Sequence, residues 1–266
     1  MLTSVLVALA VISPEPALVV TTLPFDEPQK QRAVFASLDQ ELSRMLGRRV
    51  QFRASATYKD SVAQLRERRA DVALLGAAAY IEARKGGDVR AILRTIRHRQ
   101  GNYYGVIVVK RGSPFRSLKD LKGKRFAFVD PGSTSGYVFA RRLLASASID
   151  PEQDLTISFA GGHHKVVEQV AQGTVDAGAC FEGAQDTLVD PEAVTPIART
   201  ELVPGDPVVV RGGLAPQLIK ELRVALIELA NSPAAKPFFT YADIDGFVPA
   251  IDSDYDALAE MMRAPQ

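Results

Sequence analysis

Residues 125–144 read RFAFVDPGSTSGYVFARRLL, and this stretch is the most informative part of the chain. Its first five residues form an apolar run that predicts a buried strand, and its last eight have apolar side chains at helical spacing. Three hydroxyl side chains, Ser133, Thr134 and Ser135, therefore stand where a strand passes into a helix. The first N–H groups of a helix have no partner inside it, and the helix dipole is positive there. This turn predicts a site for a tetrahedral oxyanion, whereas a simpler interpretation makes Ser133 or Ser135 only a helix cap.

Strands and helices alternate along the rest of the chain. Helical spacing predicts helices at 34–46, 59–68 and 163–172, and apolar runs predict strands near 18–23, 50–54, 71–76, 155–159 and 175–180. This alternation is typical of a parallel or mixed sheet covered by helices. Ligands bind such sheets at the carboxyl ends of strands, which is where the hydroxyl turn and His163 stand.

Two extended segments, 103–110 and 206–211, have no long helix directly after them. Their positions suit a two-lobed α/β protein in which the chain crosses to a second lobe and returns. We expect residues 18–105 and 209–266 to form lobe 1 and residues 106–208 to form lobe 2. Each lobe is then a mixed sheet flanked by helices, each crossing acts as a hinge, and a ligand cleft lies between the lobes.

Composition argues against several classes of protein. Lys plus Arg number 32 and Asp plus Glu number 31, and this near balance argues against a nucleic-acid partner. We expect the basic cluster of Arg94, Arg97, His98 and Arg99 to form a solvated face or loop. The single cysteine, Cys180, permits neither an internal disulfide nor a paired-cysteine zinc motif.

The chain lacks the usual signals for a cofactor or metal. The phosphate-loop pattern that would indicate ATP hydrolysis is absent. His163 and His164 are adjacent, and adjacent residues of a helix point about 100° apart, so they are poorly placed to hold one ion. We therefore expect no cofactor and no metal.

The first residues, 1–17, resemble part of an export signal. Their apolar core is too short to span a bilayer and has the length of a signal-peptide core. The basic residues that normally precede such a core are missing, so the segment is either a trimmed or late-starting signal or an ordinary first strand. We expect export to the periplasm or another extracytoplasmic space.

Six short blocks stand in order along the chain: ADVALLG at 70–76 with Tyr80, SLKDLKGK at 117–124, DPGSTSG at 130–136, FAGGH at 159–163 with GTVDAG at 173–178, PGDPVVVR at 204–211, and DYD at 254–256. Together they resemble the substrate-binding proteins of phosphonate, phosphite and phosphate ABC transporters. These are type II periplasmic binding proteins. The resemblance runs from about residue 18 to residue 262 and implies two α/β lobes that close over a ligand.

The resemblance also implies ligand-binding residues from both lobes. The hydroxyl turn would hold the phosphonate oxygens, and the histidine that begins the 163–172 helix would complete the cradle. Tyr58 and Tyr104 would line the lobe 1 wall, with Tyr103 as the alternative to Tyr104. Asp206 matches a position that can face the ligand's ammonium group in aminophosphonate binders, although an aspartate there also suits a turn before Pro207. The implied set is Ser133, Thr134, Ser135, His163, Tyr58, Tyr104 and Asp206.

Two blocks depart from the family pattern. Gly162-His163-His164-Lys165 stands where the family has GSHD, which makes the site more basic. Residues 76–80 read GAAAY and lose a serine beside the cleft. Fewer donors in lobe 1 would suit a ligand whose non-phosphoryl end is small or apolar.

The sequence therefore predicts a monomeric binding protein that captures phosphate, phosphite or a small phosphonate and delivers it to the permease of an ABC importer. No bond would be made or broken. The alternatives are the ligand-sensing domain of a signalling system, a binder of another small anion such as a sulfonate, and an enzyme. The turn at 132–136 does not match the G-x-S-x-G nucleophile elbow, because its central residue is Thr134.

Overall fold

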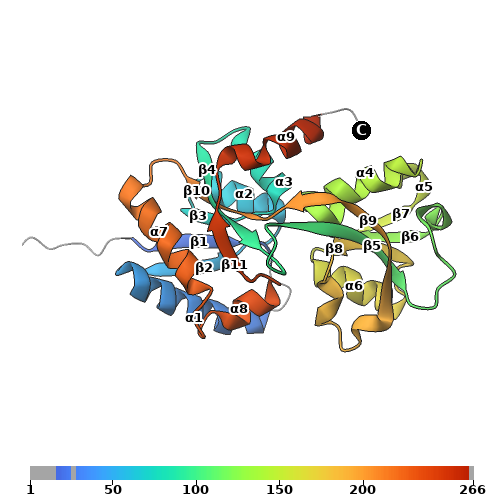
Figure 1. Cartoon of the computed structure of the whole chain (residues 1–266), viewed down its shortest axis with the longest axis horizontal. Coiled ribbons are helices and arrows are strands. Elements are labelled where there is room, and N and C mark those ends of the chain that lie inside the picture. Colours follow the sequence, from blue (N-terminus) through green and yellow to red (C-terminus); the bar gives the residue numbers. More distant parts are fainter. Residues whose placement is uncertain (1–15, 25–27, 264–266) are drawn as a thin grey trace, which may run out of the picture.

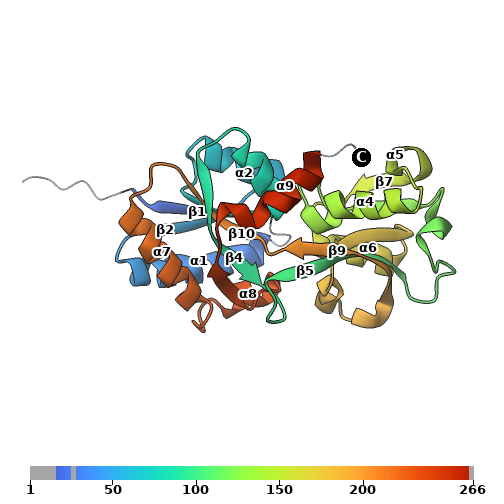
Figure 2. The same ribbon diagram turned by 45° about the horizontal axis from the view of Figure 1, so that its top comes forward.

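The computed structural model describes residues 16–24 and 28–263 and contains two β-sheets (Figure 1). The two sheets lie one beyond the other along the long axis of the molecule, each with helices packed around it (Figures 1 and 2). We call the part built on the first sheet lobe 1 and the other part lobe 2. The signal-like segment falls, up to residue 15, outside the described residues.

Lobe 1 is built on a six-stranded mixed sheet in the order β11-β4-β10-β3-β1-β2. Its strands are β1 (Leu18–Thr22), β2 (Val50–Ala54), β3 (Val72–Leu74), β4 (Val89–Ile96), β10 (Pro207–Arg211) and β11 (Gly246–Pro249). β1 runs parallel to β2 and β3, and β10 is antiparallel to both β3 and β4. The strands β1 to β4 therefore point the same way, and their carboxyl ends share one edge of the sheet.

Helices cover both faces of this sheet because neighbouring strand residues point to opposite sides. Val72 packs in the apolar cluster under α1, α7 and α8, whereas Ala73 packs in the cluster under α2, α3 and α9. The helical elements are α1 (Pro28–Leu46), α2 (Tyr58–Arg66), α3 (Ala77–Arg84), α7 (Pro216–Leu229), α8 (Lys236–Tyr241), η5 (Asp252–Tyr255) and α9 (Asp256–Arg263).

Lobe 2 is built on a five-stranded mixed sheet in the order β7-β6-β8-β5-β9. Its strands are β5 (Asn102–Lys110), β6 (Arg125–Phe128), β7 (Thr156–Phe159), β8 (Ala177–Phe181) and β9 (Val194–Pro204). β6 is parallel to β7 and β8, so the carboxyl ends of these three strands meet. Its helical elements are η1 (Leu118–Leu121), η2 (Thr134–Val138), α4 (Phe139–Ser146), α5 (Pro151–Asp154), α6 (His163–Gln172), η3 (Ala184–Thr187) and η4 (Pro191–Ala193).

The chain passes between the sheets at two adjacent places. The first is a tight turn in which Arg97 and Gln100 exchange backbone hydrogen bonds of 2.9 and 2.8 Å. The second is Gly205, whose N–H donates to the carbonyl of Gly101 at 2.9 Å. A Cβ at Gly205 would lie 2.3 Å from the carbonyl oxygen of Thr95, so only glycine fits this crossing.

The strands at the crossings begin earlier than the expected lobe boundaries at 105 and 208. β5 begins at Asn102 and β10 begins at Pro207, because backbone pairing with β9 and with β4 extends each strand back to the crossing. The movement of the two lobes as separate bodies stays a prediction. None of the helices in the described residues is long and apolar enough to cross a membrane.

Candidate ligand-binding site

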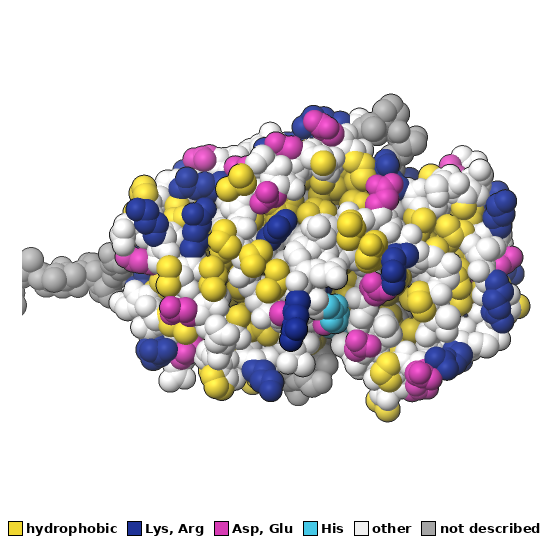
Figure 3. All heavy atoms as spheres, in the orientation of Figure 1, with side chains coloured by type: hydrophobic (Ala, Val, Ile, Leu, Met, Phe, Trp, Pro, Cys, Tyr) yellow, Lys and Arg dark blue, Asp and Glu magenta, His cyan; other side chains and the backbone are white. Residues whose placement is uncertain are grey.

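A cavity of about 100 Å³ lies between the two lobes. Residues from both sheets line it, and most of them follow the carboxyl end of a strand. Figure 3 shows the notch between the lobes on one face of the molecule, with basic and acidic side chains scattered over both sides. This mixture agrees with the net charge of +1.

The hydroxyl turn lies on the lobe 2 wall of the cavity. β6 ends at Phe128, and the helix begins with the π-helical turn η2 before it continues as α4. The Ser133 Oγ caps this turn by accepting a hydrogen bond from the N–H of Gly136 at 3.2 Å. A Cβ at Gly136 would lie 2.3 Å from Cγ2 of Val129, so this glycine lets the helix start pack closely on the strand end. Ser133 is thus both a helix cap and a cavity residue.

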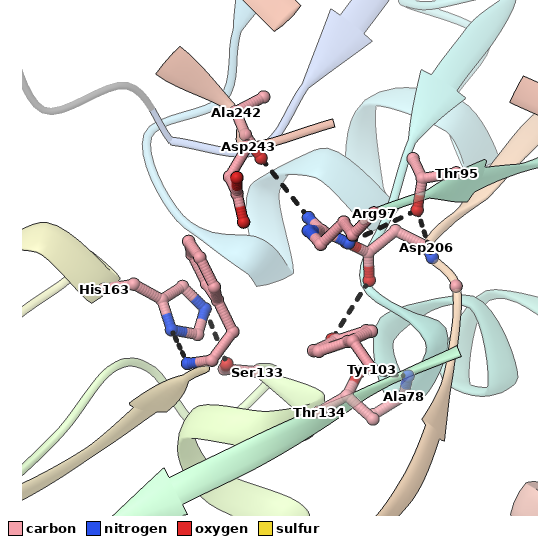
Figure 4. Close-up of polar contacts among 12 residues, drawn as sticks. Ala78, Thr95, Arg97, Tyr103, Ser133, Thr134, His163, Asp206, Ala242 and Asp243 are labelled. Carbon is pink, nitrogen blue, oxygen red and sulfur yellow. Dashed lines mark hydrogen bonds and ion pairs between the residues drawn. The ribbon is translucent and has the colours of Figure 1, made fainter. Parts of the chain in front are cut away.

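Thr134 joins the two lobes. Its Oγ1 accepts a hydrogen bond of 3.0 Å from the N–H of Ala78, in the first turn of α3 (Figure 4). Gly132, in the same turn, also lies close to Tyr58 of lobe 1. A Cβ built on Gly132 would lie only 2.7 Å from the Tyr58 Cβ. Lobe 1 and lobe 2 therefore touch around the cavity.

Ser135 is not among the residues that line the cavity, and its role in binding stays a prediction. It is 1% exposed and packs against β5, where a Cβ on Gly105 would come within 3.1 Å of the Ser135 Cβ. The reason is geometric, since successive residues of a helical turn point in different directions. Ser133 and Thr134 line the cavity, while Ser135 is buried beside it, with its side chain within reach of the Tyr103 side chain.

His163 lies beside Ser133 because β6, β7 and β8 end together. Its Nδ1 accepts a hydrogen bond of 3.1 Å from the backbone N–H of Phe181. Its Nε2 lies 3.4 Å from the Ser133 Oγ (Figure 4). The same Nε2 lies 3.5 Å from the Tyr58 hydroxyl. Because Nδ1 accepts, the proton of the neutral ring is on Nε2, which becomes a donor directed at the cavity.

The His163 ring is neutral at ordinary pH. Burial lowers its pKa to about 3, and the charges of His164 and Arg97 act in the same direction. Tyr58, which begins α2 after the carboxyl end of β2, brings its hydroxyl to the same place from lobe 1. The structure thus brings Ser133, His163 and Tyr58 together, as the resemblance implied.

Tyr103 lines the cavity and Tyr104 does not, which corrects our first choice between them. The two residues are consecutive on β5, so their side chains point to opposite faces of the sheet. The Tyr103 hydroxyl donates to Oδ1 of Asp206 at 3.4 Å, whereas the Tyr104 ring packs under the guanidinium of Arg199 at 4.7 Å. Sequence alone leaves this choice open because it does not show the strand's orientation.

Arg97 is a cavity residue that sequence reasoning missed. We expected it on a solvated surface, but it is 8% exposed, and its Nη2 lies 3.0 Å from Oδ2 of Asp206 (Figure 4). Asp206 is 6% exposed, and burial raises its pKa although the Arg97 charge opposes the shift. Arg97 follows the carboxyl end of β4. Because ligands bind such sheets at the carboxyl ends of strands, this position could have identified Arg97 as a candidate.

The donors around the cavity suit an anion better than a metal ion. In the part of the chain that the structure describes, no group of three or more His, Cys, Asp and Glu side chains is arranged to hold a metal ion. Cys180 is buried, and burial raises the pKa of its thiol to about 12.

A family profile described as "ABC transporter, phosphonate, periplasmic substrate-binding protein" matches residues 20–255. The phosphate-import protein PhnD of Mycolicibacterium smegmatis is 26% identical over 263 residues, which cover 89% of this chain and 82% of that protein. PhnD1 from Prochlorococcus marinus, solved in complex with methylphosphonate, has a TM-score of 0.81 at 22% identity and covers 93% of this chain and 97% of its own.

A third similar protein is a binding protein component of an ABC phosphonate transporter from Pseudomonas aeruginosa. Its crystal structure has a TM-score of 0.82 at 21% identity, over 93% of this chain and 86% of that one. The similarity extends over both lobes. It confirms the predicted fold class, a two-lobed type II periplasmic-binding-protein fold with a mixed sheet in each lobe.

Proposed function

The chain belongs to the family of periplasmic substrate-binding proteins of phosphonate ABC transporters, and we propose that it captures a small phosphorus oxyanion between its lobes. The candidates are phosphate, phosphite and short phosphonates. The protein then delivers the ligand to the permease of an ABC importer. It acts as a monomer on the outer side of the cytoplasmic membrane, in keeping with relatives that are periplasmic.

One observation carries the proposal. The Ser133 Oγ and the His163 Nε2 are 3.4 Å apart and lie beside the start of a helix on one cavity wall. The Ser133 hydroxyl, the Nε2–H and the N–H groups at the start of this helix are donors on the same wall of the cavity, where the oxygens of the ligand would bind. Hydrogen bonds to a charged acceptor are roughly twice as strong as neutral ones, so a few such donors hold a small anion in a site shielded from water.

The size of the cavity limits the ligand. An engineered protein cavity of about 150 Å³ holds a benzene molecule, and the cavity between these lobes measures about 100 Å³. Phe181, Phe238 and Ile244 contribute apolar walls. A tetrahedral phosphorus oxyanion with no substituent or a methyl group matches both the volume and the lining.

The proposal assigns binding and no catalysis. The donors beside Ser133 and His163 need not gain or lose a proton to bind an anion, because the His163 ring is neutral and the hydroxyls are uncharged. Two of the similar proteins agree with this proposal, since one is named for phosphate import and the other was solved with methylphosphonate.

A thermal-unfolding screen tests the proposal. The ligands are phosphate, phosphite and methylphosphonate, with sulfate and methanesulfonate as matched anions that lack phosphorus. A ligand present at 100 times its Kd stabilises the folded state by about 2.7 kcal/mol, which raises the Tm. We expect at least one phosphorus oxyanion to raise the Tm more than its sulfur counterpart. A response to the sulfur anions alone would replace the proposal with a sulfonate binder.

A further inference from the structure

The wall of the cavity opposite Ser133 carries an acidic residue, Asp206. Among the described residues that line the cavity, Asp206 is the only one with a carboxylate. Figure 4 shows it across the cavity from Ser133 and His163, beside Arg97. A carboxylate in this place would be the natural partner of a cationic group on a ligand whose anionic end is bound at Ser133.

Both oxygens of this carboxylate already have partners within the protein. Oδ2 pairs with Nη2 of Arg97 at 3.0 Å, and Oδ1 accepts a hydrogen bond from the Tyr103 hydroxyl at 3.4 Å. The backbone N–H of Asp206 donates to Oγ1 of Thr95 at 2.9 Å, which fixes the residue from the other side. A ligand cation would have to displace one of these groups.

Arg97 is itself held firmly in place. Its Nη1 donates to Oγ1 of Thr95 at 3.3 Å, and its Nη2 lies 3.5 Å from the carbonyl oxygen of Ala242. Its guanidinium carbon lies 4.8 Å from the centre of the Tyr103 ring and 5.4 Å from that of the Phe181 ring. A second cation beside this group would meet a like charge in a buried site, where water screens the repulsion only weakly.

We infer that Arg97 is a specificity-determining residue that stands beside Asp206 in place of a ligand's ammonium group. The site therefore accepts phosphorus oxyanions without a positive charge and rejects aminoalkylphosphonates. This inference rests on the proposed function and narrows its ligand class. It also gives Arg97 a role that does not depend on contact with the ligand.

The test removes the Arg97 guanidinium and asks whether the ammonium group of a ligand can take its place beside Asp206. Wild-type protein and the variant Arg97→Met are titrated with methylphosphonate, aminomethylphosphonate and 2-aminoethylphosphonate by calorimetry. We expect the wild type to prefer methylphosphonate to both amines by at least about tenfold. In Arg97→Met the Asp206 carboxylate loses its cationic partner, repels the anion and attracts the ammonium group, so the preference falls by at least about tenfold or reverses.

Two further variants separate this effect from damage to the fold. The double variant Arg97→Met with Asp206→Asn removes both charges, and we expect it to bind methylphosphonate without gaining affinity for the amines. Arg199→Met makes the same substitution outside the cavity, where Arg199 pairs with Glu182, and should leave the preference unchanged. Melting temperatures measured without ligand show whether each variant is folded.

The outcomes distinguish the inference from the function on which it rests. Wild-type protein that binds an aminoalkylphosphonate as tightly as methylphosphonate would overturn the inference and leave the proposed function intact. So would a folded Arg97→Met variant with an unchanged preference. Wild-type protein that binds no phosphorus oxyanion would overturn the proposed function itself.

Discussion

Nδ1 of His163 accepts a hydrogen bond of 3.1 Å from the backbone N–H of Phe181. This contact joins the end of β8 to the start of α6 and fixes which ring nitrogen carries the proton. The Nε2–H is then available to the cavity, next to the Ser133 Oγ. One ring nitrogen of His163 therefore makes a structural hydrogen bond, while the other faces the cavity, where we propose that it binds the ligand.

The buried ring predicts a pH dependence of stability. In the unfolded chain His163 takes up a proton near its ordinary pKa of 6.5, whereas in the folded protein burial delays protonation to about pH 3. Between these values the unfolded state binds more protons, so the free energy of unfolding falls as the pH falls. We expect urea unfolding to show a steeper loss from pH 6.5 to pH 3 in the wild type than in His163→Gln. Curves of equal slope would contradict the assignment.

Ser133 and Ser135 should differ although both stand in the same motif. Ser133→Ala removes a donor to the ligand, and we expect it to weaken methylphosphonate binding by about 1.5 to 3 kcal/mol. Ser135→Ala changes a residue that packs against β5 and should leave the affinity close to that of the wild type. Calorimetry on the two variants checks this. A loss of affinity in Ser135→Ala but not in Ser133→Ala would contradict the proposed position of the ligand beside Ser133.

Gly132 should be needed for the lobes to meet. Alanine there would place a Cβ 2.7 Å from the Tyr58 Cβ, closer than such atoms approach, and neither atom is at the end of a flexible side chain. We expect Gly132→Ala to fold normally, because the lobes relieve the clash by staying apart, and to bind ligand weakly. Small-angle X-ray scattering with saturating ligand should report a larger radius of gyration for the variant than for the wild type. A variant as compact as the wild type would show that the contact does not limit closure.

The neighbours Tyr103 and Tyr104 form a second matched pair. Tyr103→Phe removes the hydroxyl that donates to Asp206 and should weaken binding by about three- to tenfold, since a buried acceptor loses its partner. Tyr104→Phe alters a ring that packs against Arg199 outside the cavity and should have no effect on affinity. Equal effects of the two substitutions would argue against the observed orientation of β5.

Local patterns were enough to predict much of the fold. The apolar run at 125–129 followed by glycines and hydroxyls indicated a strand, a turn and a helix, and β6, η2 and α4 stand there in that order. The alternation of strands and helices also indicated mixed sheets. These features depend on neighbouring residues, which is why a single sequence reveals them.

The parts of the site that the sequence did not predict depend on long-range contacts. The pairing of Arg97 with Asp206 joins residues that are 109 positions apart and arises only when both crossings lie side by side. The choice between Tyr103 and Tyr104 depends on which face of β5 is covered by which helix. The burial of Ser135 follows from the close approach of Gly105.

A crystal structure of the protein grown with methylphosphonate tests the central claim most directly. The account predicts one ligand in the cavity between the lobes, with phosphonate oxygens within hydrogen-bond distance of the Ser133 Oγ, the His163 Nε2 and the N–H groups at the start of η2. Arg97 would remain paired with Asp206. A ligand bound elsewhere, or bound in the cavity with its oxygens away from Ser133 and His163, would contradict the claim.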